Sequence, residues 1–287
     1  MASHRPYSRD PQSPPSVTQV LSLMDKPGLV WGAARETANF AVRHQESWRD
    51  MPTDVAVTTL SRHHRGVWDH RALIGTAIHT INSQWCAGHT VRLVDVITEM
   101  RDKSPLWQRK TEQELYAELL PMADGLGKMW QKLKLETLSF EQVVRYRPPV
   151  TAGLGALDYI GQTDWRALVD GRPLLLELKT TGNTTAGKAK YWDTWRLQLA
   201  AYRYASHGVE YNNDDQEVRE TRLAEVDGAA VIHVYGDGQA QVDGVQAGPA
   251  EHEVFLALRR AYGWRKAEGE HPGKDVPVFW TDGAVTV

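Results

Sequence analysis

The sequence predicts a mixed α/β (α+β) domain with a central mixed β-sheet, flanking helices and an N-terminal helical wall. Residues 16–140 are mainly helical in their apolar spacing, whereas residues 141–287 alternate β-type runs with two helical segments. This order of elements is typical of an α/β or α+β domain. We expect residues 1–15, which are polar and rich in Pro and Ser, to form a flexible leader. Residues 16–287 are then expected to form one domain, which at this length can bury a sizeable core.

Several helices and strands are expected along the chain. The helical segments are 16–60 with a break at 26–29, 72–88, 111–133 with an interruption or kink at Pro121, 194–208 ending at Gly208, and 250–267. Residues 91–100 are ambiguous between helix and strand. The β-type segments are 135–148, 154–169, 172–182 and a hairpin over 228–245, with a polar loop at 211–217.

Composition excludes several classes of protein. No run reaches 18 apolar residues and the N-terminus lacks the apolar segment of a signal peptide, so we expect a cytoplasmic protein with no membrane partner. A single cysteine, Cys86, cannot form an internal disulfide, a four-cysteine zinc site or an iron–sulfur cluster held by this chain alone. The net charge of −3 gives no broad basic surface for nucleic acid, although residues 128–147 and 259–266 are locally basic.

A tight hairpin is predicted around Asp170 and Gly171, which stand between two apolar runs. A two-residue turn here places Asp164 directly opposite Glu177 on the same face. Two like charges at opposed positions are destabilising, and a divalent cation between them would remove the conflict. Lys179 points to the same face because strand side chains alternate. A longer loop or a bulge would shift this pairing by one residue.

The other face of the predicted hairpin is apolar. It carries Trp165, Ala167, Val169, Leu174, Leu176 and Leu178. We therefore expect one packed face and one face that presents Asp, Glu and Lys together. Asp158 is a rival to Asp164 as the acidic partner of Glu177, but it needs a different turn centre.

Asp164 followed by Glu177-x-Lys179 resembles the motif of the PD-(D/E)XK nuclease superfamily. Three further motifs resemble its RecB-type, phage-like exonuclease branch, in the expected order. They are GTAIH ending at His79, GQTD ending at Asp164, and QLAAY with Gln198 and Tyr202. Together the motifs span residues 75–202, a little under half of the chain.

The resemblance implies a restriction-endonuclease-like core and a divalent metal, Mg²⁺ or Mn²⁺. It implies that Asp164, Glu177, His79 and the backbone carbonyl of Leu178 bind the metal, since carboxylate and carbonyl oxygens suit these ions. Lys179 would position the attacking water or stabilise developing charge. Gln198 and Tyr202, one helical turn apart, would brace the site or contact DNA. Since the chain has one cysteine, no iron–sulfur cluster is expected.

The expected activity is metal-dependent hydrolysis of DNA phosphodiesters, by an exonuclease acting in recombination or end processing. DNA is then the substrate, and a single-strand annealing recombination protein or further copies of this chain are candidate partners. One alternative is an inactive DNA-binding or assembly protein on the same scaffold. Another is a metal-dependent phosphohydrolase acting on small nucleotides.

Other residues near the motifs leave alternatives open. Any of His63, His64 and His70 is a candidate neighbour of the site in place of His79. Trp192 and Trp195 are core residues or base-stacking platforms, and Trp192 is the better stacking candidate.

Overall fold

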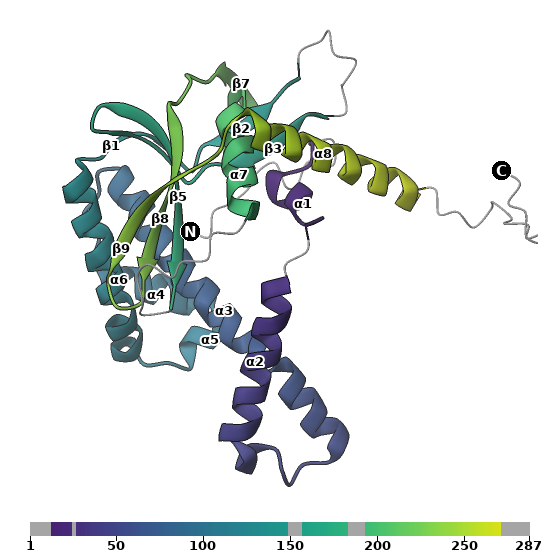
Figure 1. Ribbon diagram of the computed structural model, residues 1–287. Helices are drawn as coiled ribbons and strands as arrows, with labels where there is room; N and C mark the ends of the chain where they lie inside the picture. Colours follow the sequence, from purple (N-terminus) through teal and green to yellow (C-terminus); the bar gives the residue numbers. More distant parts are fainter. Residues whose placement is uncertain (1–12, 25–26, 149–156, 183–192, 271–287) are drawn as a thin grey trace, which may run out of the picture.

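The structure, a computed structural model, describes residues 13–24, 27–148, 157–182 and 193–270 (Figure 1). Trp192 therefore lies outside the described residues. The helices are α1 (Val17–Leu21), α2 (Pro27–Arg43), the short 3-10 helix η2 (Gln45–Ser47), α3 (Thr53–Cys86), α4 (Leu93–Lys103), α5 (Pro105–Gln108), α6 (Glu112–Leu133), α7 (Asp193–Tyr204) and α8 (Pro249–Glu270).

The strands form two sheets rather than the one that the sequence predicted. They are β1 (Glu136–Phe140), β2 (Val143–Tyr146), β3 (Tyr159–Gln162), β4 (Trp165–Val169), β5 (Arg172–Thr181), β6 (His207–Tyr211), β7 (Glu217–Arg222), β8 (Gly228–Tyr235) and β9 (Ala240–Val245). The first sheet has the order β1-β4-β5-β8-β9, and only its β5–β8 pair is parallel. The second has the order β3-β2-β6-β7 and is antiparallel. The expected mixed α/β class with N-terminal helices is confirmed.

The second sheet was not predicted, because its edge strand β7 has no apolar pattern. Strand β7 is charged and largely exposed, so it lacks the apolar alternation that marks a half-buried strand. The preceding helix was also predicted too long, since α7 ends at Tyr204 and Gly208 belongs to β6. A Cβ at Gly208 would lie 2.6 Å from Nε2 of Gln142, which explains a glycine in this strand.

Two other expectations are settled by the helices. Residues 91–100 are helical within α4, and α6 continues through Pro121 without interruption. The predicted break at residues 26–29 corresponds to the start of α2 at Pro27, where a proline at the first helical position is well tolerated.

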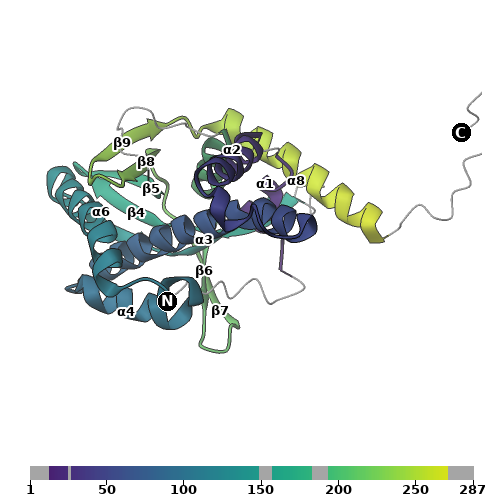
Figure 2. The ribbon, with the colours of Figure 1, turned by 90° about the horizontal axis from the view of Figure 1, so that it is seen from below.

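The five-stranded sheet is covered on both faces (Figure 2). Helices α3, α4 and α6 pack on the face that carries Trp165, Leu176 and Leu178. Helices α1, α7 and α8 pack on the other face, where Leu175 and Val231 are 2% and 0% exposed. The apolar face of the hairpin is core, as predicted. The charged residues lie on a face that is also packed.

Across the described ranges, no helix has the length and apolar composition needed to cross a membrane.

Two glycines hold α6 against the turn between β8 and β9. A Cβ on Gly125 would collide with the backbone carbonyl of Gly238, and Gly238 itself has a positive φ of 83°. Gly127, half a turn away on the same helix, has room, since its Cβ would meet only Trp85 at 3.5 Å. Both glycines lie inside α6, so they differ only in how much room an added methyl group has.

We predict opposite effects for Gly125→Ala and Gly127→Ala on the free energy of unfolding. Gly125→Ala should lower it by about 1–3 kcal/mol, because backbone must move to admit the methyl group. Gly127→Ala should raise it by up to about 1 kcal/mol, because alanine favours the helix. Urea unfolding of both variants measures the difference, and equal effects would contradict the close approach.

Candidate active site

The hairpin has the predicted turn and register. Asp170 and Gly171 both have positive φ values, 49° and 75°, as a type I′ turn requires. The pairs run from Val169 opposite Arg172 to Trp165 opposite Leu176. Continued by one step, this register brings Asp164 opposite Glu177.

The β4–β5 ladder ends at the pair of Trp165 and Leu176, and Asp164 immediately precedes β4. The Leu178 amide donates to Oδ2 of Asp164 at 2.9 Å, so the side chain supplies the acceptor that a further strand residue would otherwise offer. The Asp164 carbonyl in turn accepts from the Glu141 amide at 3.0 Å. These two bonds fix the Asp164 carboxylate at the edge of β5, beside Leu178.

Glu177 is buried, with 3% of its surface exposed, and its two oxygens differ. Oε1 accepts from Nζ of Lys179 at 2.5 Å and from Nε2 of Gln198 at 2.9 Å. Oε2 is buried and has no hydrogen-bond partner within the described chain. A buried carboxylate oxygen without a donor is costly, so this atom is a candidate ligand for a cation.

The charges in the site influence one another strongly. Burial, and next the Asp164 carboxylate, raise the pKa of Glu177 above its usual value, against the opposing effect of Lys179. Burial alone would lower the pKa of Lys179, but Glu177 and Asp164 outweigh it and the pKa is raised. Lys179 is therefore an ammonium at neutral pH. A cation near Oε2 would offset both influences that disfavour the Glu177 carboxylate.

His79 reaches this edge from α3. Its Nε2 lies 3.1 Å from the Leu178 carbonyl, and its Nδ1 lies 3.8 Å from Oδ1 of Asp164. Gly75, one turn earlier, permits the approach, since a Cβ there would be only 3.1 Å from Oγ1 of Thr180. The helix thus places an imidazole beside two oxygen groups of the hairpin.

Gln198 and Tyr202 support the site from α7. Nε2 of Gln198, which donates to Glu177, also lies 3.4 Å from the Tyr202 hydroxyl. The Tyr202 ring packs against Gly161, where a Cβ would lie 2.5 Å from Cε1. The glycine of GQTD and the tyrosine of QLAAY are therefore in close contact, which holds α7 against β3.

The rival residues lie elsewhere. Asp158 pairs with Arg259 at 3.4 Å, so its carboxylate is engaged with α8. His70 accepts from Nε1 of Trp107 and contacts Glu118 at 2.8 Å, in a separate network. His63 stacks on Phe40, and His64 packs edge-on against Trp68.

Sequence reasoning missed two residues beside Lys179. Nζ of Lys179 lies 5.8 Å from the Trp195 ring centroid, and Trp195 packs edge-on against His233. His233 is opposite Lys179 in the parallel β5–β8 register, and burial lowers its pKa, so it is neutral at physiological pH. Trp195 was considered only as core or stacking platform. His233 could be found only from the parallel β5–β8 register, and no local sequence pattern reveals that register.

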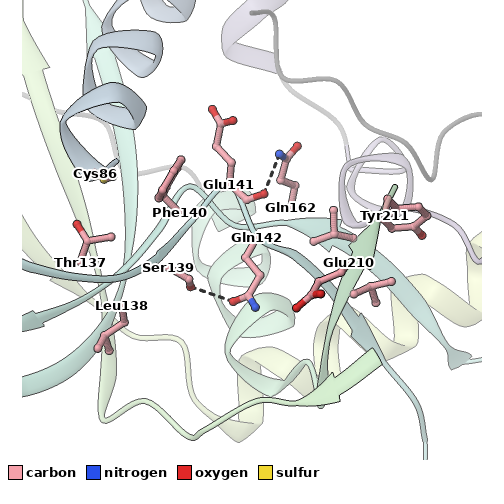
Figure 3. A pocket seen from close by; sticks show the side chains of 12 residues that line it. Cys86, Thr137, Leu138, Ser139, Phe140, Glu141, Gln142, Gln162, Glu210 and Tyr211 are labelled. Carbon is pink, nitrogen blue, oxygen red and sulfur yellow. Dashed lines mark hydrogen bonds between the residues drawn. The ribbon is translucent and has the colours of Figure 1, made fainter. Parts of the chain in front are cut away.

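A hollow of about 600 Å³ is lined by residues of both sheets (Figure 3). Glu141 and Gln162 line it, and Nε2 of Gln162 donates to the Glu141 carbonyl at 3.0 Å. Glu141 has a positive φ of 45°, and its carboxylate accepts from Ser83 at 2.8 Å. None of Asp164, Glu177 and Lys179 lines this hollow.

The residues present fit a hard cation in part. Asp164, the orphaned Oε2 of Glu177 and the Leu178 carbonyl are oxygen donors of the kind that Mg²⁺ and Mn²⁺ prefer, and His79 adds a nitrogen. However, no three His, Cys, Asp or Glu side chains in the described ranges gather closely enough to form a metal site by themselves. The backbone carbonyl and water would complete the ligand set.

Comparison with known proteins adds little. No family model and no curated protein matches the chain. A solved structure described as the crystal structure of SSO0001 is similar at 12% identity and a TM-score of 0.30, covering 69% of this chain and 86% of that chain. A similarity at this TM-score carries no argument about fold or function.

We predict that Lys179→Ala lowers the free energy of unfolding by about 3 kcal/mol at pH 7, because it leaves Glu177 buried without its cation. The pKa of Glu177 then rises further, so the folded state binds a proton at a higher pH than the unfolded chain. The loss should therefore shrink between about pH 7 and pH 5.

Urea unfolding at both pH values measures this effect. Lys103→Ala is the matched control, since Lys103 pairs with Glu99 at the surface and its loss should cost less than about 1 kcal/mol. A pH-independent loss for Lys179→Ala would contradict the coupling of Glu177 to Lys179.

Proposed function

We propose that this protein is a metal-dependent DNA nuclease of the RecB-type PD-(D/E)XK class, with a restriction-endonuclease-like core. One observation carries the proposal. At the end of the β4–β5 hairpin, Asp164 and Glu177 adjoin an ammonium from Lys179, and one Glu177 oxygen accepts no hydrogen bond from the described residues. In phosphodiester hydrolysis, two such carboxylates would hold a metal ion, and the ammonium would position water or stabilise charge.

The proposed metal is Mg²⁺ or Mn²⁺. Asp164, Glu177, the Leu178 carbonyl and His79 would hold it. When bound, such an ion neutralises charge on the phosphodiester and lowers the pKa of the attacking water. The imidazole of His79 favours Mn²⁺ more than an all-oxygen site would.

The protein's own groups have distinct tasks in this proposal. Lys179 places a positive charge where the water and the phosphate oxygens meet, which positions the nucleophile or stabilises developing charge. Gln198 holds Oε1 of Glu177 at 2.9 Å and leaves Oε2 directed elsewhere. Asp164 is held by the Leu178 amide, so its carboxylate needs little reorganisation.

An exonuclease in recombination or end processing is the activity that the motifs favour. One observation favours the alternative of an inactive DNA-binding protein on the same scaffold, namely that the described residues form no cluster of three metal-ligating side chains. Cleavage assays separate the two.

The test is a time course on end-labelled linear DNA and on closed circular DNA, with Mg²⁺, Mn²⁺ or EDTA, beside a mononucleotide substrate. We expect metal-dependent degradation of linear DNA, none with EDTA and none of the mononucleotide. Binding of Mn²⁺ without cleavage of any nucleic acid would favour the inactive scaffold. Hydrolysis of the mononucleotide alone would favour a small-nucleotide phosphohydrolase.

Lys179→Ala should reduce the cleavage rate by at least about 100-fold while Mn²⁺ and DNA binding persist, because a bound divalent ion replaces the lost positive charge beside Glu177. Asp158→Asn is the control and should cleave normally, since Asp158 is engaged with Arg259 outside the site. Calorimetric titration with Mn²⁺ shows whether the site still binds metal. Full activity of Lys179→Ala would remove this residue from the mechanism.

A further inference from the structure

Helix α7 contacts the ion pair of Glu177 and Lys179 with two residues of one face. Trp195 and Gln198 are three positions apart, so their side chains are neighbours on the helix. Nε2 of Gln198 donates to Oε1 of Glu177 at 2.9 Å. Nζ of Lys179 lies over the Trp195 ring, 5.8 Å from its centroid. The helix therefore meets the carboxylate with a hydrogen-bond donor and the ammonium with an aromatic face.

The contact between Lys179 and Trp195 has the geometry of a cation–π interaction. The negative potential of an aromatic face attracts an ammonium within about 6 Å of the ring centroid, and tryptophan attracts it most strongly. The Lys179 side chain is 25% exposed and Trp195 is half-buried, so water is partly excluded from the contact. Such contacts become stronger as water is removed.

Two further rings fix the orientation of Trp195. His233 packs edge-on against Trp195 with ring centroids 5.9 Å apart, and it stacks on Tyr235 at 4.6 Å. His233 is 5% exposed and Tyr235 is 1% exposed, so these rings form a buried support. Burial lowers the pKa of His233, so at neutral pH the support carries no positive charge that would repel Lys179.

The ion pair with Glu177 does not by itself define where the Lys179 ammonium points. Nζ donates to Oε1 of Glu177 at 2.5 Å. An ammonium has three donors on a flexible stem, so one hydrogen bond leaves its direction open. A metal ion held by Glu177 would also repel Lys179, since both are cations. The Trp195 ring is neutral, so its attraction for the ammonium is free of this conflict.

We propose that Trp195 is a positioning residue for Lys179. Its ring holds the ammonium beside Glu177 when a metal ion binds the carboxylate. An aromatic face takes up no full hydrogen bond, so N–H groups of Lys179 stay available for the attacking water or a phosphate oxygen. The catalytic consequence rests on the proposed nuclease activity, whereas the contact itself does not.

Trp195 also packs against the core. It contacts the buried cluster that contains Leu197 and Val231. If packing were its whole role, the cost of replacing Trp195 would not depend on the charge of Lys179. A positioning role makes the cost depend on that charge, which gives the two roles different experimental signatures.

A double-mutant cycle on the metal-free chain at pH 7 separates the two roles. Lys179→Met removes the charge and keeps an unbranched stem, and Trp195→Leu removes the aromatic face. We expect Trp195→Leu to raise the equilibrium constant for unfolding at least about threefold more in the parent than in the Lys179→Met background, the size of a partly exposed cation–π contact. Urea unfolding of the four proteins measures this ratio.

Trp85→Leu combined with Lys179→Met is the matched control cycle. Trp85 is also half-buried, but it packs against Trp130 on the α3 side of the sheet. Its replacement should have the same effect in both backgrounds, because substitutions at separate sites are additive. Trp195→Phe is the milder variant should Trp195→Leu fail to fold, and it should keep part of the coupling through its weaker ring face. Circular dichroism confirms the folding of each variant.

Cleavage of linear DNA at saturating Mn²⁺ tests the catalytic consequence. Trp195→Leu should lower kcat about tenfold, with KM for DNA and the calorimetric affinity for Mn²⁺ changed less than about twofold, and Trp195→Phe should recover most of the rate. An additive unfolding cycle, or an unchanged kcat in a chain that cleaves DNA, would overturn the inference. A parent chain that cleaves no DNA would reject the proposed function instead, and the unfolding cycle would then decide whether Trp195 holds Lys179.

Discussion

The hydrogen bond from the Leu178 amide to the Asp164 carboxylate organises the candidate site. It lies just past the end of the β4–β5 ladder, at the pair of Trp165 and Leu176, and leaves the Leu178 carbonyl facing α3 rather than another strand. The place of His79 depends on this ending, because its imidazole lies in the space that a longer β4 would fill. The place of Glu177 follows from the same register. A change of one residue in the turn would exchange the two faces of the hairpin and separate these groups.

The charged groups are held inside a sheet that is packed on both faces. Glu177 is 3% exposed, and among the described residues its neighbours include the Asp164 carboxylate and the Lys179 ammonium. Such an arrangement is unfavourable for folding alone, since a buried ion pair rarely repays its loss of hydration. Proteins retain it chiefly where the groups have a chemical task. Oε2 of Glu177 also has no hydrogen-bond partner among the described residues.

Local chemistry made the hairpin predictable. Asp170 and Gly171 fix the turn, the turn fixes the register, and the register fixes which residues face Glu177. The contact of His79 with this edge came from a family motif and not from a physical pattern. The adjacency of Lys179 and His233 was not predicted, because it requires the parallel β5–β8 pairing across an intervening helix and two strands. The family assignment and the single-domain boundary remain predictions.

The length of α3 constrains how this chain can vary. Its 34 residues, about 51 Å of helix, run from the contacts that His63 and Trp68 make with α2 to the edge where His79 meets Leu178. Deleting one residue between Trp68 and His79 would turn the two ends relative to each other by about 100°. Either the side that contacts α2 or the imidazole would then face the wrong way. Insertions and deletions compatible with this architecture should therefore fall in the loop around η2. A change of length there does not rotate one end of α3 relative to the other.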